Sequence, residues 1–178
     1  MPHYKRLFLE QYKYVFITIV TYNRTPLLTE NVEILKNSIK KAHSKYNFKI
    51  FAICIMPEHL HMIIKLDNIH DYPKIIYSIK YYFSKYTKIS KVELSESKIK
   101  KGEKGIWQRR YWEHTIRDES DLYKHLDYIH FNPIKHNLVK SLKDYKYSTF
   151  KNFVKIGLYD GNWCNYEDKN KILDLNFE

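Results

Sequence analysis

The segment FKIFAICIMPEHLHMIIKL, residues 48–66, sets the architecture expected for this chain. Its first part, residues 48–56, is nearly all apolar, which predicts a central strand that is buried in the sheet. Met56, Pro57 and Glu58 interrupt the apolar run and predict a short break. The second part, residues 59–66, predicts a third strand that runs back beside the first part. The segment therefore predicts a central strand followed by a strand that runs back.

The strand predicted over residues 59–66 has two chemically different faces, because alternate residues of a strand point to opposite sides. One face is wholly apolar and consists of Leu60, Met62, Ile64 and Leu66. The other consists of His59, His61, Ile63 and Lys65. The apolar face should meet helices, so we expect both imidazoles on the open face, as half of a site for a divalent ion. Alternatively, they are ordinary half-exposed strand residues, because the chain has nine histidines.

The remaining segments complete a recognisable order of elements. Further strands are expected at residues 13–22 and 106–116, and helices at residues 29–44, 71–88 and 118–132. Pro133 should stop the last helix, and the polar, basic residues 90–105 should form a mobile loop. The order β-α-β-β-α-β-α matches the split βαβ, ferredoxin-like arrangement. The expected fold class is α+β, with an antiparallel sheet, helices on one face and an added C-terminal helix.

Length and cysteine content suggest one domain in a reducing compartment. A chain of 178 residues can build its own core, and its longest apolar runs are too short to cross a bilayer. The basic N-terminus lacks the apolar stretch of a signal peptide. Cys54 and Cys164 form neither a disulfide framework nor a metal-ligand spacing. We therefore expect a cytoplasmic protein.

The net charge favours a polyanionic partner. The chain has 31 Lys and Arg against 20 Asp and Glu, a formal charge of +11 and a pI of about 9.4. Neutralising phosphates releases counterions, so such an excess favours nucleic acid. The alternative is that many lysines are solvated surface supplied by an AT-rich genome.

The arginines are more informative because the chain has only five. Arg109, Arg110 and Arg117 lie within nine residues, and the aromatic residues among or beside them are Trp107, Tyr111 and Trp112. Guanidinium groups bind phosphates and aromatic rings stack on unpaired bases, so this segment indicates single-stranded nucleic acid. A purely structural cluster of arginine and aromatic residues is the alternative.

The helix predicted over residues 118–132 brings a tyrosine beside an amide. Asp118 is expected to cap the N-terminus of this helix. Leu122, Leu126 and Ile129 form the face that should dock on the sheet. The adjacent face carries Tyr128 and Asn132, which are neighbours one turn apart. The chain has seventeen tyrosines, so Tyr128 by itself is more simply a packing residue. The spacing leaves other possible metal ligands open: His114, His130 and His136.

Two sets of motifs, in this order, resemble those of a known family. Residues 56–61, MPEHLH, resemble the His-hydrophobic-His motif of HUH nucleases, in the form used by single-tyrosine transposases. Residues 107–114, WQRRYWEH, and 127–136, DYIHFNPIKH, resemble the REP-associated tyrosine transposases, a branch related to the small insertion-sequence transposases. Relatives commonly have Gly at the position of Asn137, where Asn also tolerates a left-handed backbone.

The resemblance implies a single HUH transposase-like domain over residues 1–178, with a catalytic core at about residues 10–140 and a tail over residues 141–178. It implies that His59 and His61 bind Mg²⁺ or Mn²⁺, that Asn132 is a third ligand, and that Tyr128 is the nucleophile. Residues expected to hold the DNA strand are Arg109, Arg110, Arg117, Trp107, Tyr111 and Trp112.

The function implied by the resemblance is metal-dependent cleavage and transfer of single-stranded, hairpin-forming DNA through a covalent 5′-phosphotyrosine. It favours a monomer over a homodimer. Two alternatives remain: a non-catalytic module that binds nucleic-acid hairpins, and a hydrolase that uses water. A mobile transposase and a host-retained relative would share the same catalytic residues.

Overall fold

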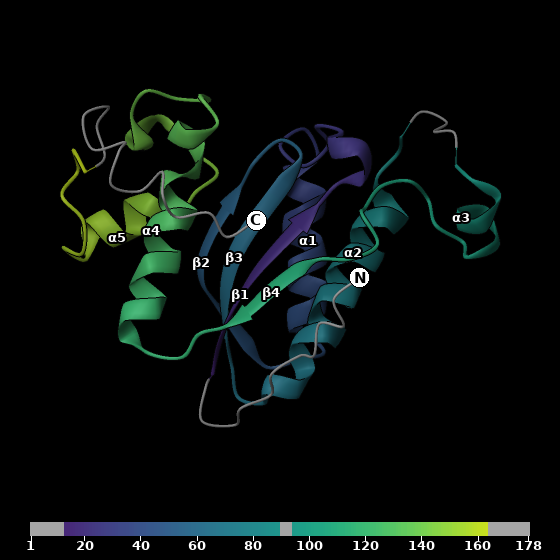
Figure 1. Cartoon of the computed structure of the whole chain (residues 1–178), viewed down its shortest axis with the longest axis horizontal. Coiled ribbons are helices and arrows are strands. Elements are labelled where there is room, and N and C mark those ends of the chain that lie inside the picture. Colours follow the sequence, from purple (N-terminus) through teal and green to yellow (C-terminus); the bar gives the residue numbers. More distant parts are fainter. Residues whose placement is uncertain (1–12, 90–93, 164–178) are drawn as a thin grey trace.

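The computed structural model describes residues 13–89 and 94–163 (Figure 1). In chain order, its main elements are β1 (Tyr14–Val20), α1 (Val32–His43), β2 (Phe48–Ile55), β3 (His59–Leu66), α2 (Tyr72–Tyr86), α3 (Glu96–Lys100), β4 (Trp112–Thr115), α4 (Glu119–Lys135) and α5 (Phe150–Lys155). Single turns of 3-10 helix lie at Tyr22–Arg24, Ile69–Asp71 and Leu142–Asp144. The predicted order from β1 to α4 is confirmed, with the short α3 inserted where residues 90–105 were expected to form a loop.

The four strands form one antiparallel sheet in the order β2-β3-β1-β4. This is the order of a split βαβ fold, in which β3 lies between β2 and β1. Strands β2 and β3 pair as predicted, from Phe48 opposite Leu66 to Ile55 opposite Leu60. The expected α+β class is therefore confirmed.

The apolar sequence of β2 predicted a central strand, but β2 lies at the edge of the sheet. Its outer edge is covered by the chain after α4. The Ile55 amide donates to the Tyr147 carbonyl (2.9 Å), and the Thr149 amide donates to the Ile53 carbonyl (2.9 Å). An edge strand whose backbone groups are bonded in this way can be as apolar as a central one.

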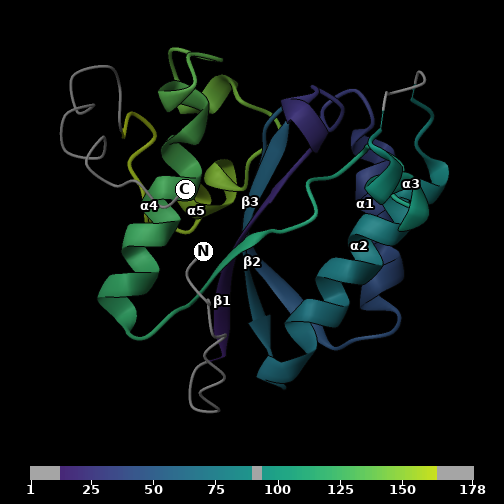
Figure 2. The ribbon, with the colours of Figure 1, turned by 45° about the vertical axis from the view of Figure 1, so that its right-hand side comes forward.

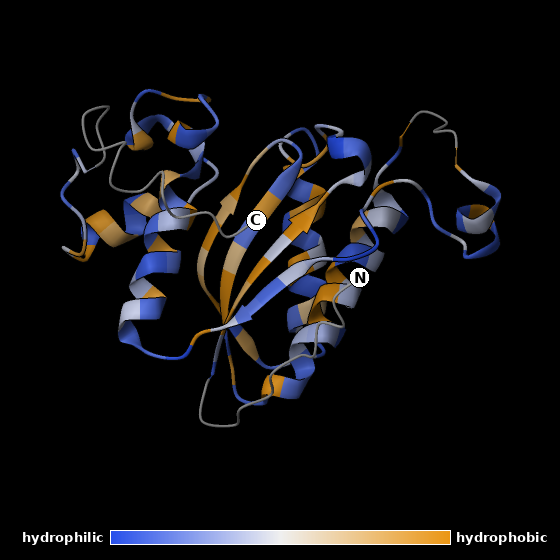
Figure 3. Cartoon of the chain, in the orientation of Figure 1, coloured by the Kyte–Doolittle hydropathy of each residue, from blue (hydrophilic) through white to orange (hydrophobic). Residues whose placement is uncertain are grey.

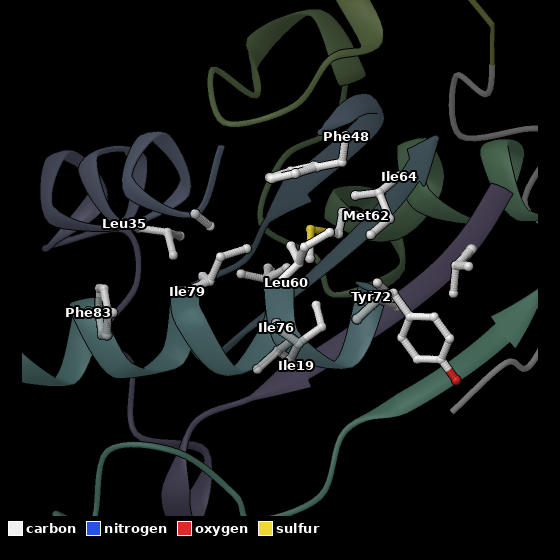
Figure 4. Packing of buried hydrophobic residues seen from close by; sticks show 14 of the residues in the cluster. Ile19, Leu35, Phe48, Leu60, Met62, Ile64, Tyr72, Ile76, Ile79 and Phe83 are labelled. Carbon is white, nitrogen blue, oxygen red and sulfur yellow. The ribbon is translucent and has the colours of Figure 1, made fainter. Parts of the chain in front are cut away.

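Helices α1 and α2 cover one face of the sheet with an apolar core (Figure 4). The strand residues at this interface include Ile19, Leu60 and Met62, all at most 1% exposed. Ile79 and Phe83 of α2 are fully buried against them. The hydrophobic residues concentrate on β1, β2 and β3, whereas β4 is hydrophilic (Figure 3).

The opposite face of the sheet is covered by α4 and α5, so the sheet lies between two helical layers (Figure 2). Here Phe16, Cys54 and Ile63 pack with Leu126 and Ile129 of α4. The expectation that this face is open to solvent was therefore wrong. The added helix lies over the sheet rather than along its edge.

Helix α4 begins and continues for identifiable reasons. The Asp118 side chain accepts from the Asp121 amide (2.8 Å), which caps the N-terminus as predicted. Pro133 does not stop the helix: α4 continues to Lys135, and burial of Phe131 on one side of the proline and Ile134 on the other favours the helical path. Asn137 follows with a φ of +56°, the left-handed conformation expected at this position.

The strand expected over residues 106–116 is shorter than predicted. Only Trp112–Thr115 pairs as a strand, while Trp107 forms an isolated bridge with Thr21. Gln108, Arg109 and Arg110 between these points are exposed. No helix in the described part of the chain combines the length and the apolar character needed to cross a bilayer.

Candidate active site

Two histidines of β3 form the centre of the candidate site. His59 and His61 are fully buried on the sheet face that α4 covers, and their ring centroids lie 4.7 Å apart at an interplanar angle of 76°. They share this face because they are two residues apart on one strand. The prediction that they lie side by side is confirmed, but they are buried under α4 rather than on an open face.

Each imidazole is held through its Nδ1 atom. His61 Nδ1 lies 2.8 Å from the hydroxyl of Thr18, which is directly opposite on β1. His59 Nδ1 lies 3.0 Å from a carboxylate oxygen of Glu58. When Nδ1–H donates to these oxygens, Nε2 carries the lone pair that binds a metal ion. Sequence reasoning missed Thr18, because the register of β1 against β3 is a long-range property.

Tyr128 approaches these histidines from α4, and Asn132 follows it on the same helix. Tyr128 is 1% exposed, and its ring centroid lies 5.2 Å from that of His61. Asn132 is fully buried one turn further on, and its Nδ2 donates to the Tyr128 carbonyl (2.8 Å). Asn132 Oδ1 is buried and has no hydrogen-bond partner among residues 13–89 and 94–163. The amide therefore offers a buried oxygen, a ligand type suited to Mg²⁺ or Mn²⁺.

His136, which follows α4 directly, lies at the same site. Its ring centroid is 5.0 Å from that of His59. Its Nε2 is buried and makes no hydrogen bond within the described residues. Of the three other histidines considered from the sequence, His136 is therefore the one that reaches His59.

His130 has a different role, although it lies on the same helix. Its Nε2 lies 3.0 Å from the Thr149 hydroxyl, and its ring packs against Phe153 and Tyr159. Burial lowers the pKa of His130 to about 3, so the ring is neutral near pH 7. These contacts make His130 a core residue.

A second group of possible metal ligands consists of His114, Asp121 and His125, whose ligand atoms lie within 4.8 Å of one another. Asp121 already accepts hydrogen bonds: its Oδ2 lies 2.7 Å from His114 Nε2 and 2.9 Å from the Arg117 amide. His125 Nδ1 lies 3.1 Å from Asp121 Oδ1 and 2.8 Å from the Asp121 carbonyl. The three residues join β4 to the start of α4.

The existing hydrogen bonds and the ring geometry favour hydrogen bonding over metal binding in this second group. Burial raises the pKa of the Asp121 carboxyl, but hydrogen bonds from His114 and the Arg117 amide outweigh it and hold that pKa below its usual value. Burial lowers the pKa of His125. The rings of His114 and His125 are stacked 4.5 Å apart at 13°. An ion between two stacked rings would lie outside the plane of at least one, where no nitrogen lone pair points.

The residues expected to hold DNA differ in their exposure to solvent: the arginines are exposed, whereas the aromatic residues are buried or half-buried. Arg109 and Arg110 are exposed, and so is Arg117, whose Nε lies 3.4 Å from Asp121. Trp107 is buried: its ring packs 5.0 Å from Phe83, and its indole N–H donates to the Lys80 carbonyl (3.2 Å).

The other two aromatic residues are half-buried. Tyr111 packs against the α1 and α2 core. Trp112 lies on the α4 side of the sheet, with its ring 5.4 Å from Phe16. The segment thus supplies exposed cations with aromatic rings that the fold fixes in place.

Comparison with known proteins gives consistent matches over almost the whole chain. Residues 8–132 match the family model described as IS200-like transposase. The chain is 39% identical over 170 residues to a Haemophilus influenzae protein named as a REP-associated tyrosine transposase, covering 94% of this chain and 96% of that protein. It is 34% identical over 164 residues to the REP-associated tyrosine transposase of Escherichia coli, covering 92% of each.

The fold also matches a solved structure of a REP-associated tyrosine transposase bound to a REP hairpin. The TM-score is 0.74 at 33% sequence identity, and the match covers 92% of each chain.

Proposed function

Because the chain belongs to the IS200-like transposase family, in the branch of the REP-associated tyrosine transposases, we propose that it cuts and rejoins single-stranded, hairpin-forming DNA through Tyr128. One observation carries this proposal. His59 and His61 of β3 are buried beside Tyr128 of α4, with the Tyr128 and His61 rings 5.2 Å apart, and Asn132 is buried one helical turn further along α4. Buried polar side chains that converge in this way fit a reaction centre better than a packing interface.

In this proposal His59 and His61 bind Mg²⁺ or Mn²⁺ through Nε2, and Asn132 binds it through Oδ1. The amide oxygen is a ligand type that both ions prefer, whereas two imidazole nitrogens suit a transition-metal ion such as Mn²⁺ better than Mg²⁺. The Nδ1 contacts to Glu58 and Thr18 support this choice of nitrogen. When bound, the ion supplies Lewis-acid polarisation of the scissile phosphate. His136 is the candidate for a further ligand, on account of its buried Nε2 beside His59.

Tyr128 is the proposed nucleophile. Its phenolic oxygen forms a bond to phosphorus as the bond to the 3′-oxygen breaks. The phenol loses its proton, and the departing 3′-oxygen takes one up to become a hydroxyl. The product is a 5′-phosphotyrosine, which retains the phosphodiester bond energy. A second strand with a free 3′-hydroxyl can therefore be joined by the reverse reaction without ATP.

Exposed arginines would hold the strand near this site. Arg110 precedes β4 in the sequence and Arg117 follows it. The guanidinium groups of both residues can bind phosphates bidentately. Trp112, half-buried between them in sequence, has a ring on the α4 side that can contact a base. In this scheme Arg109 and Tyr111 contact the strand further along, on the α2 side of the sheet, while the buried Trp107 fixes their segment to the core.

We propose that a monomer carries out this chemistry. Helix α4 packs on β2 and β3 of its own chain, so one molecule brings the nucleophile to the proposed metal ligands. This arrangement supports the monomer expected from the resemblance.

The test is formation of a covalent adduct. Labelled single-stranded DNA from either side of the gene, with its hairpins, is incubated with protein and Mg²⁺ or Mn²⁺, and then resolved by denaturing electrophoresis. We expect a metal-dependent DNA–protein band that Tyr128→Phe abolishes. The matched control is Tyr123→Phe, on the same helix but 41% exposed, which should keep the band.

Other outcomes separate the alternatives. Cleavage without an adduct would indicate a water nucleophile. Tight hairpin binding without cleavage would indicate a non-catalytic binding module. A band that persists in Tyr128→Phe would exclude Tyr128 as the nucleophile.

A further inference from the structure

A groove lies on the other side of the molecule from the candidate active site. It has a volume of about 690 Å³ and runs between α2 and residues 101–111. Helix α2 covers one face of the sheet and α4 covers the opposite face (Figure 2). His61 lies on the α4 face, in contact with Tyr128. The groove, here called the α2 groove, therefore cannot be part of the site that contains Tyr128.

The outer wall of the α2 groove exposes two tyrosines of α2. Tyr77 is 71% exposed and Tyr81 is 50% exposed. They are one helical turn apart, and their rings stack with centroids 6.2 Å apart at 18°. Large aromatic rings exposed together beside a groove mark an interaction surface more often than a solvent face.

The charge around the α2 groove is strongly positive. Its lining contains a single acidic side chain, Glu103. The basic side chains in the lining are Lys80, Lys85, Lys101, Lys104 and Arg109. Such an excess selects a polyanion, and together with exposed aromatic rings it suits the phosphates and bases of an unpaired strand.

The walls of the α2 groove are tied together, so the groove is preformed. The Lys80 ammonium donates to the Gln108 carbonyl (2.7 Å) and the Arg109 carbonyl (3.2 Å), and the Lys104 ammonium lies 3.3 Å from the Ser84 carbonyl. The buried indole N–H of Trp107 donates to the Lys80 carbonyl, which ties residue 107 to α2. A preformed site loses less entropy when it binds a ligand.

We propose that the α2 groove binds a single-stranded segment of nucleic acid, with bases stacked on Tyr77 and Tyr81 and phosphates beside Lys85, Lys101 and Arg109. The identity of the strand rests on the proposed function: it is the unpaired DNA that continues from the segment cut at Tyr128. Binding here needs neither the metal ion nor the nucleophile.

The experiment measures binding where no cleavage can occur. The Tyr128→Phe protein in EDTA is titrated into a fluorescent thymidine oligonucleotide of about 15 nucleotides. The double variant Tyr77→Ala/Tyr81→Ala should bind about tenfold to hundredfold more weakly. The matched control is Tyr86→Ala, which removes a 55% exposed tyrosine of α2 that does not line the groove, and should bind unchanged.

A second variant tests the charge. Lys85→Gln/Lys101→Gln should reduce the slope of log K against log salt by about one to two. Lys36→Gln, on the exposed side of α1, should leave the slope unchanged. Thermal unfolding of each variant confirms that it is folded.

The proposal is overturned if the parent does not bind the oligonucleotide, if the Tyr77/Tyr81 variant binds as tightly as the parent, or if Tyr86→Ala weakens binding equally. Formation of the covalent adduct is measured in a separate experiment with the unsubstituted protein. Groove binding without an adduct would contradict the proposed nuclease activity and leave the groove assignment intact.

Discussion

The two faces of the sheet bury side chains of opposite character. Against α1 and α2, strand residues such as Ile19 and Met62 belong to an apolar core. Against α4, the same strands bury His59, His61 and Thr18. Buried polar groups cost stability unless they are hydrogen-bonded, whereas apolar burial stabilises. One face therefore supplies the stability that allows the other to hold reactive groups in a fixed arrangement.

The largest expected effect concerns stability on the apolar face. Phe83 is fully buried against the sheet and Trp107. Phe83→Ala should lower the free energy of unfolding by about 3–5 kcal/mol, through lost burial and an unfilled cavity. Chemical denaturation measures this, and the Ile156→Ala control, at a 75% exposed site, should stay within about 0.5 kcal/mol. A small effect of Phe83→Ala would show that the two faces do not divide their roles in this way.

The next effect concerns metal affinity on the polar face. Thr18→Val keeps the shape of a buried side chain but removes the oxygen 2.8 Å from His61 Nδ1. We expect metal affinity to fall by about 10- to 100-fold, as for other groups that orient a ligating histidine. The metal dependence of adduct formation measures this change, with the exposed Thr25→Val as control. An unchanged metal dependence would remove His61 from the proposed ligand set.

Acid should lower the free energy of unfolding through His130, which is buried on the α4 side of the sheet. The pKa of His130 is lowered to about 3 by burial, so the folded chain binds fewer protons than the unfolded chain between that pH and about 6.5. The contribution of His130 to the free energy of unfolding is therefore nearly complete near pH 7, and it is smaller by about 2 kcal/mol at pH 5. Denaturation at both pH values should show a smaller loss in His130→Gln, while the exposed His70→Gln should behave like the parent. An identical loss in His130→Gln would assign the acid response to other groups.

The smallest effect concerns the surface. Arg117 is largely exposed, and its contact with Asp121 is long at 3.4 Å. Arg117→Gln should change stability by less than about 0.5 kcal/mol. It should nevertheless weaken DNA binding and reduce the salt slope by about one. Binding isotherms at several salt concentrations test this, and an unchanged slope would exclude a phosphate contact at Arg117.

Local patterns in the sequence predicted much of the fold. Alternation over residues 59–66 placed His59 and His61 on one face, and helical spacing placed Leu126 and Ile129 on the core side of α4. Both are properties of a single element. The sequence also predicted the Asp118 cap, because capping depends on residues three apart.

The features that local patterns failed to predict depend on how helices and strands pack against one another. Burial of His59 follows from the position of α4, and the edge position of β2 is compensated by the backbone of residues 147–149. Trp107 could have stacked on a base, but it packs on Phe83 of a helix far from it in sequence. The approach of His136 to His59 depends on α4 continuing through Pro133, which a local rule for proline argued against.

The central claim is that Tyr128 carries the DNA, and one measurement can identify the tyrosine. Trypsin cleavage after Lys124 and Lys135 releases HLDYIHFNPIK, in which Tyr128 is the only tyrosine. After adduct formation and nuclease digestion of the bound DNA, mass spectrometry should find a residual 5′-phosphonucleotide on this peptide and on no other. A nucleotide on a different tyrosine peptide, or an adduct that leaves this peptide unmodified, would contradict the assignment of the site.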